Sequence, residues 1–169
     1  MISLEPKVAV LMGSASDADA MQGCTGLLKS LEIPCETKVL SAHRTPDETR
    51  KYAVSAAERG IEVIIAAAGW AAHLAGVVAA HTTLPVIGVP IDSSPLHGMD
   101  ALLATVQMPP GVPVATMAVG SGGAKNAAVF AGEILALKYP AIAKNITAYR
   151  ESMTRNTLRR ARDFERENE

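Results

Sequence analysis

Five short runs of apolar residues recur along the chain, and each has the length of a β-strand. Most are continuous rather than alternating with polar residues, as expected for strands that are covered by helices on both faces. Glycine, proline and small polar residues flank the runs and favour turns at their ends. The predicted strands are residues 7–13, 35–42, 63–69, 85–91 and 113–119.

Longer segments with helical spacing of apolar residues separate the predicted strands. Because strands and helices alternate, the pattern predicts a parallel sheet with helices on both sides. After the last strand one helix is expected to run to about residue 138, and the "YPAI" segment then breaks the pattern before a second, amphipathic helix. The predicted helices are residues 17–31, 46–59, 71–82, 124–138 and 141–165.

The connection between the fourth and fifth predicted strands, residues 92–112, is unusually long. It begins and ends in turn-forming residues, and its middle holds at most a short helix. Connections of this length between core strands are often functional. With 169 residues and no linker or repeat, residues 1–169 are predicted to form one domain, with a core at about 7–137 and an extra C-terminal helix.

Composition and charge narrow the possible partners. No apolar run approaches the roughly 18 to 20 residues of a membrane helix, and the N-terminus lacks a signal-peptide pattern, so we expect a soluble cytoplasmic protein. A net charge of −1, with acids and bases interspersed, gives no basic surface for nucleic acid or an anionic membrane. Cys24 and Cys35 lack metal-ligand spacing and are predicted to be buried, reduced thiols.

Ligands of open α/β sheets bind at the carboxyl ends of the strands, so the residues that follow each strand are candidates for a site. "GSASDADA" follows the first strand, and Ser14, Ser16 and Asp17 begin the next helix after a glycine turn. Free N–H groups at such a helix start suit a phosphate or a sugar hydroxyl. Ordinary N-capping explains the same residues equally well, and the motif is neither a Walker loop nor a complete GxGxxG.

"SAHRTPDE" follows the second strand. Thr45 as N-cap, Pro46 at the first helical position and Glu48 at the third match a capping box. This explanation leaves out His43 and Arg44, which lie in the turn where side chains face the crevice. Arginine suits bidentate phosphate binding, and histidine exchanges protons near neutral pH. We predict a functional pair here, although either residue alone is also compatible with a solvated loop.

"AAAGWAAHLAG" follows the third strand, and its small residues allow a backbone to approach a ligand closely. An isolated histidine such as His73 more often packs or caps a helix, but its position one strand from His43 favours a role in the site. His81 and His97 are weaker candidates. No metal-ligand spacing, serine elbow or Cys–His pair is present. The residues thus indicate a phosphate-bearing small molecule and proton transfer by histidine, with no metal or redox cofactor.

Taken together, six segments resemble a known family, the small carboxyaminoimidazole ribonucleotide mutases of purine synthesis. These form class I of the phosphoribosylaminoimidazole carboxylase catalytic subunit family. The segments follow the family's order and spacing over about residues 7–137, and "SAHRTP" with the "QMPPGVPVAT" stretch is specific. The six are "MGSASD", "SAHRTPD", "AAHLAG", "LPVIGVP", "GMDALLATVQMPPGVPVAT" and "AKNAA".

The resemblance implies a flavodoxin-like three-layer α/β sandwich with a parallel five-stranded sheet, assembled as a homo-octamer and needing no cofactor. It implies an isomerase that interconverts N5-carboxyaminoimidazole ribonucleotide and 4-carboxyaminoimidazole ribonucleotide through release and recapture of CO2. His43 matches the acid–base histidine, which protonates nitrogen as CO2 leaves and then removes the C4 proton. The positions that match substrate contacts are Ser14, Ser16, Asp17, Ser41, Arg44, Gly69, His73 and Leu74.

By the same resemblance, Arg44 and nearby serines contact the phosphate, Asp17 contacts the ribose, and the "GWAAHL" loop holds CO2. This loop departs from the family's usual "GAGGAAHLPGM". Ala67 and Trp70 stand at glycine positions, and Ala75 stands at a proline position. Whether Trp70 narrows the CO2 pocket or points into a subunit contact stays open at the level of sequence.

Three other functions also stay open. A related branch of the family carboxylates aminoimidazole ribonucleotide directly with CO2, but it tends to carry lysine where this chain has Arg44. A non-catalytic nucleotide-binding module would share the fold, although the intact His43, Asp17 and His73 disfavour it. A flavodoxin-like electron carrier is disfavoured because the chain has only two Phe, three Tyr and one Trp to build the aromatic walls expected of a flavin site.

Overall fold

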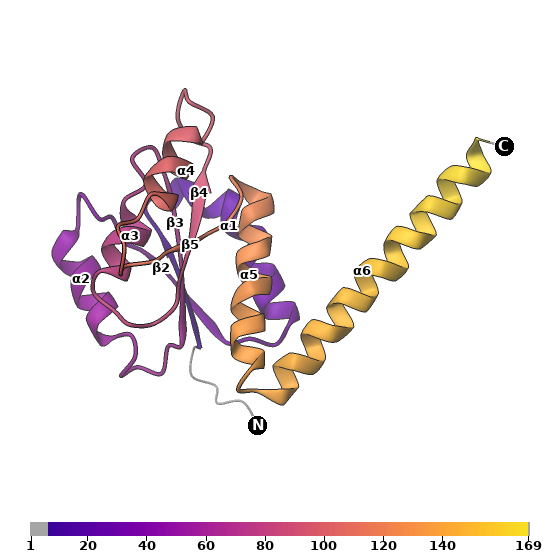
Figure 1. The fold of residues 1–169 in the computed structure, drawn as a ribbon, viewed down its shortest axis with the longest axis horizontal. Helices are drawn as coiled ribbons and strands as arrows, with labels where there is room; N and C mark the ends of the chain where they lie inside the picture. The colour runs from indigo at the N-terminus through magenta and orange to yellow at the C-terminus, as the bar shows by residue number, and fades with distance from the viewer. Residues whose placement is uncertain (1–6, 169) are drawn as a thin grey trace.

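The computed structural model describes residues 7–168, which form a five-stranded parallel sheet with helices on both faces (Figure 1). The spatial order β2-β1-β3-β4-β5 is that of flavodoxin-like folds, in which the chain first moves to one side of β1 and then to the other. The predicted α/β sandwich is confirmed. The strands are β1 (Val8–Met12), β2 (Cys35–Val39), β3 (Val63–Gly69), β4 (Val86–Ile91) and β5 (Ala115–Thr116).

Helices and strands alternate along the chain in the predicted order. A short 3₁₀ turn, η1, precedes the first α-helix, and α4 is the short helix expected within residues 92–112. α2 and α3 are shorter than predicted, since α2 ends at Ser55 and α3 begins only at Leu74. The elements are η1 (Ala15–Asp17), α1 (Ala18–Ser30), α2 (Pro46–Ser55), α3 (Leu74–Ala79), α4 (Met99–Val106), α5 (Ser121–Ala136) and α6 (Pro140–Glu167).

Alternate residues of each strand point to opposite faces of the sheet, and this divides the core in two. In β1, Val8 and Val10 pack with α1, α5 and the first turns of α6, whereas Ala9 and Leu11 pack with α2 and α3. Figure 1 shows α1 and α5 on one side of the sheet and α2 and α3 on the other. Both faces of the central strands are covered, which is why their sequences are continuously apolar.

β5 is much shorter than the predicted strand 113–119. Only Ala115–Thr116 pairs with β4, and the last backbone bond between these segments runs from Gly120 N to Pro90 O. Pro90 has no N–H, so β4 donates no hydrogen bond to β5 at this level. The proline therefore ends the ladder.

α6 extends far beyond the sheet (Figure 1). Its first turns are held in the core by Ile142 and Ile146, which are 0% and 7% exposed. Nearly all side chains from residue 150 onward are exposed. Despite its length, α6 is charged, and no helix in the described part of the chain is long and apolar enough to cross a membrane.

The two cysteines are free and differ in burial. Cys24 is fully buried on α1, and burial, with a smaller effect from Cys35, raises the pKa of its thiol to about 12. Cys35, at the start of β2, is only half-buried. The prediction of buried thiols therefore holds fully for Cys24 alone.

We predict that Gly123→Ala destabilises the fold. A Cβ on Gly123 would overlap the carbonyl of Ala118, which is backbone and has little freedom to move aside. Overpacking of this kind should lower the free energy of unfolding by about 2 kcal/mol or more, measured by urea denaturation. Gly122→Ala is the matched control, because a Cβ there meets nothing within 4 Å. Equal stability of the two variants would contradict the prediction.

Candidate active site

A cavity of about 520 Å³ lies at the carboxyl ends of the strands. It is enclosed by the loops that follow β1, β2 and β3, together with Ser93 after β4. Met12 is paired with both Val39 and Ala67, so these three strands deliver their loops to one level of the sheet edge. All nine predicted site residues line this cavity: Ser14, Ser16, Asp17, Ser41, His43, Arg44, Gly69, His73 and Leu74.

The loop after β1 is held by a reciprocal pair of hydrogen bonds. Ser14 N donates to Asp17 Oδ2 at 3.0 Å, and Ser14 Oγ accepts from Ser16 N at 3.3 Å. This is a capping box, so the ordinary capping explanation is correct for Ser14 and Asp17. Both residues nevertheless remain in the cavity wall, and capping therefore fixes the position of groups that can also meet a ligand.

Asp17 is the one acidic side chain among the cavity-lining residues, and it is only 4% exposed. Burial raises the pKa of its carboxyl group, while the hydrogen bond from Ser14 N acts in the opposite direction with a smaller effect. The ionised form is therefore disfavoured by the protein itself. A hydroxyl donor from a ligand would restore part of the solvation that this carboxylate has lost.

In the loop after β2, the predicted capping box is wrong. Thr45 is at the N-cap and Pro46 at the first helical position, but the Thr45 hydroxyl does not bond the helix amides. Instead Thr45 Oγ1 accepts from Ser41 N at 2.9 Å and donates to Ser41 O at 3.1 Å, while the Glu48 carboxylate pairs with Lys51. The threonine therefore closes the turn that carries His43 and does not cap the helix.

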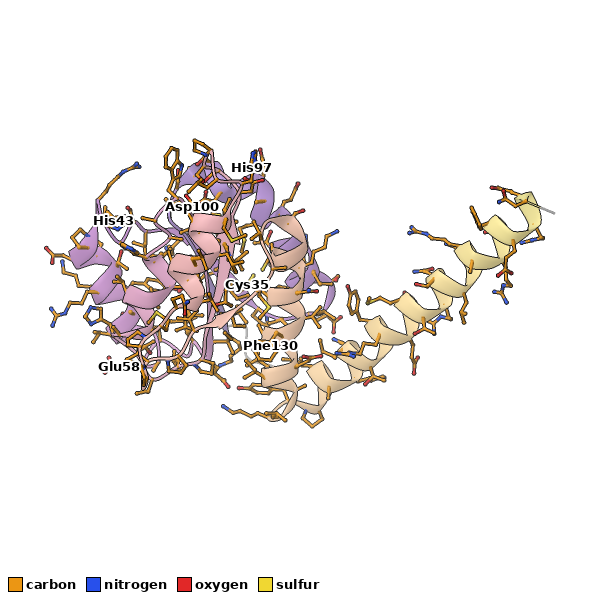
Figure 2. All side chains as sticks on the ribbon, turned by 45° about the horizontal axis from the view of Figure 1, so that its top comes forward. Cys35, His43, Glu58, His97, Asp100 and Phe130 are labelled. Carbon is orange, nitrogen blue, oxygen red and sulfur yellow. The ribbon has the colours of Figure 1, made fainter. Side chains whose placement is uncertain are left out.

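His43 and His73 are joined across the cavity by a hydrogen bond. The distance from His43 Nε2 to His73 Nδ1 is 2.8 Å, and the two rings meet edge to face at 69°. Only one proton can lie between these nitrogens, so one ring donates and the other accepts. Figure 2 shows His43 on the side of the body away from α6. The bond thus joins two loops that lie 30 residues apart in the sequence, and histidine is the side chain able to exchange protons near neutral pH.

Arg44 supplies a free positive charge beside the histidine pair. Its side chain is exposed, and within residues 7–168 no acidic group forms an ion pair with it. Its backbone N donates to Ser41 Oγ at 3.2 Å, which holds the turn without engaging the guanidinium. A guanidinium without an ion-pair partner, at a cavity that is also lined by serines, is suited to phosphate.

The loop after β3 is tightly constrained. A Cβ on Gly69 would overlap Ser93 Oγ, so glycine is required here by a neighbouring side chain. Leu74 is 1% exposed and packs into the core, which leaves its backbone to face the cavity. Trp70 and Ala72 have φ angles of 53° and 37°, in the left-handed region that favours glycine.

The structure adds one polar residue to the predicted set and leaves the two weaker histidine candidates outside the cavity. Ser93 lines the cavity; it follows β4, so the rule applied to the first three strand ends would also have found it. His81 and His97 are not among the lining residues, and Figure 2 shows His97 apart from His43. No group of three or more His, Cys, Asp or Glu side chains in the described part of the chain could hold a metal ion.

Fold and site together define an α/β protein with a cavity at the carboxyl ends of its strands, lined by serines, Asp17, Arg44 and a hydrogen-bonded histidine pair. The family model described as AIR carboxylase matches residues 7–156, and the chain belongs to this family.

Named relatives agree with this assignment. The chain is 58% identical over 150 residues to the N5-carboxyaminoimidazole ribonucleotide mutase of Pyrococcus abyssi, covering 89% of this chain and 85% of that protein. It is 51% identical to the mutase of the same name from Bacillus subtilis, covering 92% and 96%. Among solved structures, Treponema denticola PurE superposes with a TM-score of 0.80 at 27% identity, covering 91% of this chain and 95% of that one.

We predict that Asp17→Asn stabilises the fold increasingly as the pH rises. The folded-state pKa of Asp17 is raised, so its ionisation is harder in the folded than in the unfolded chain. Wild type therefore loses stability as the pH rises from about 4 through the folded-state pKa, and the asparagine variant does not. Urea unfolding of both proteins at several pH values measures the difference. A difference that is independent of pH would contradict the prediction.

Proposed function

We propose that this protein interconverts N5-carboxyaminoimidazole ribonucleotide and 4-carboxyaminoimidazole ribonucleotide in purine synthesis, using His43 as acid and base. The observation that carries the proposal is the bond of 2.8 Å between His43 and His73 in a cavity lined by serines, Asp17 and Arg44. The mutases from Pyrococcus abyssi and Bacillus subtilis, at 58% and 51% identity, support the choice of reaction. We further propose that residues 1–169 act as one mutase domain in the cytoplasm.

The loops after β1, β2 and β3 bind different parts of the substrate. The Arg44 guanidinium binds the phosphate, because within residues 7–168 it forms no ion pair and Arg44 lines the cavity together with hydroxyl donors. These donors are the side chains of Ser14, Ser16 and Ser41. Asp17 accepts a hydrogen bond from the ribose, which compensates its burial. The backbone of the Gly69–Leu74 loop holds the carboxylate and CO2.

The reaction needs one group that first donates a proton to the substrate and later removes a proton from it. Protonated His43 donates to the amino nitrogen as the carbamate C–N bond breaks and CO2 leaves. C4 then forms the new C–C bond with CO2, and the now neutral His43 removes the C4 proton, so the histidine returns to its starting state. His73 orients the imidazole through the bond to Nε2. Retention of CO2 beside C4 requires the bound substrate to exclude water from the cavity.

His43→Asn should lower kcat/KM for the carbamate by about 10³-fold, since general acid–base catalysis contributes in this range. His73→Asn should cause a smaller loss, because a positioning partner is removed and the reacting imidazole is kept. The assay follows conversion of the carbamate to the 4-carboxylate, with circular dichroism to verify folding. Wild-type turnover by His43→Asn would refute the assignment of this residue.

Direct carboxylation is the second candidate reaction, because the family model is described as a carboxylase. The same enzyme preparation is assayed with aminoimidazole ribonucleotide and bicarbonate. We expect turnover of the carbamate to be strongly preferred. Turnover of aminoimidazole ribonucleotide with none of the carbamate would overturn the mutase proposal.

We also propose that the protein is a homo-octamer in which α6 packs on neighbouring copies. The segment from residue 150 to residue 167 extends about 27 Å beyond the core contacts, and a free helix of this length is marginal in water. Met153 and Phe164, 52% and 67% exposed, continue the face that Ile142 and Ile146 bury in the core. A second apolar stripe at helical spacing is formed by Leu96, Met99, Leu103 and Val106, on and before α4.

Phe164→Glu should reduce the mass of the assembly, because it places a charge on the apolar face of α6. Arg159→Glu is the matched control: it introduces the same side chain on the opposite, charged face of the exposed helix. Light scattering measures both masses, and we expect the control to stay octameric. A monomeric wild type, or equal masses for both variants, would contradict the proposed role of α6.

A further inference from the structure

Trp70 is the only tryptophan in the sequence, and it lines the cavity. Its side chain is 60% exposed, whereas an indole is usually mostly buried in a folded protein. Its φ of 53° is one that residues other than glycine rarely adopt. Trp70 therefore packs little against its own chain while holding an unfavourable backbone conformation. Such a combination points to a partner outside the chain.

The backbone on both sides of Trp70 is anchored. Gly69 fits against Ser93, where a Cβ would overlap the serine hydroxyl. Ala72 is 3% exposed, and its N–H donates to Gly69 O at 3.0 Å, closing a tight turn around Trp70. The indole is thus attached to a constrained turn rather than to a mobile loop tip, and its position relative to the cavity is set by the core.

Trp70 also differs chemically from the rest of the cavity wall. The remaining lining residues are glycine, alanine, serine, Asp17, Arg44, the two histidines and Leu74, whose side chain is buried. Serines, Asp17 and Arg44 can bind the charged and hydroxylated parts of a nucleotide. The flat face of its base requires an apolar partner, and the indole is the one exposed large apolar side chain in this wall.

We infer that Trp70 is a substrate-binding residue of this chain, whose indole packs against the imidazole ring of the bound ribonucleotide and is shielded from water by it. This inference rests on the proposed function, because that substrate supplies the planar ring. It assigns the side chain of Trp70 to the inside of the site rather than to a contact between subunits.

Intrinsic fluorescence tests the inference directly, since all tryptophan emission comes from this one residue. The full-length His43→Asn protein, in which turnover is blocked, is titrated with 4-carboxyaminoimidazole ribonucleotide. We expect a saturable change in emission and reduced quenching by acrylamide. Ribose 5-phosphate is the matched control ligand, because it carries the sugar and phosphate without the ring, and it should leave both signals unchanged.

Calorimetry on the same samples separates failure of this inference from failure of the proposed function. If 4-carboxyaminoimidazole ribonucleotide binds without changing the emission or the quenching, the role of Trp70 is overturned and the proposed function is not. Equal changes with ribose 5-phosphate would also overturn it, because the ring would then not be the partner. Absence of both binding and wild-type turnover would instead refute the proposed function.

Two substitutions at Trp70 give an independent readout. Trp70→Gly removes the ring and suits the left-handed φ, so we expect a melting temperature no lower than that of wild type. Its KM should rise about fivefold or more, as expected when an aromatic–base contact is lost, with a smaller change in kcat. Trp70→Phe keeps an aromatic face and should restore most of the affinity. A wild-type KM for Trp70→Gly would overturn the inference.

Discussion

The parallel register of β1 with β2 and β3 is the constraint on which the rest of the structure depends. Met12 is paired with Val39 on one side and with Ala67 on the other, so three strands end at one level. The loops that follow them meet at this edge and enclose a single cavity. A slip of one residue would turn the apolar residues of a strand toward the wrong core and would also separate the loops. Packing of the sheet therefore determines the geometry of the site.

Each loop brings a different chemical group to this edge. The first carries serine hydroxyls and the buried Asp17 carboxylate, the second carries Arg44 and His43, and the third carries His73. Local interactions then fix each group: Ser14 with Asp17, Ser41 with Thr45, and Gly69 against Ser93. The left-handed backbone at Trp70 and Ala72 is tolerated because the core on both sides of the loop holds it in place.

Much of the fold and of the candidate site was predictable from local pattern. Apolar runs, continuous in most strands and interrupted by polar residues in β2, located all five strands, and the rule of strand carboxyl ends selected residues that share one cavity. Errors arose where a contact outside the expected motif determines the local structure. Pro90 of β4 shortens β5, and the hydroxyl of Thr45 closes a turn with Ser41 rather than capping α2. The motif around Thr45 is compatible with both bonds, and only the direction of the chain after β2 chooses between them.

The sequence by itself determined which residues are buried in strands, which loops follow them and which side chains can exchange protons or bind phosphate. These properties follow from periodicity and side-chain chemistry, which act over a few residues. Only the tertiary structure decided that His43 and His73 share a hydrogen bond and that the Ser93 side chain lies against Gly69, where glycine is required. Such contacts depend on the register of strands that are far apart in the chain, because atoms must come within a few ångströms before a hydrogen bond or a steric overlap exists.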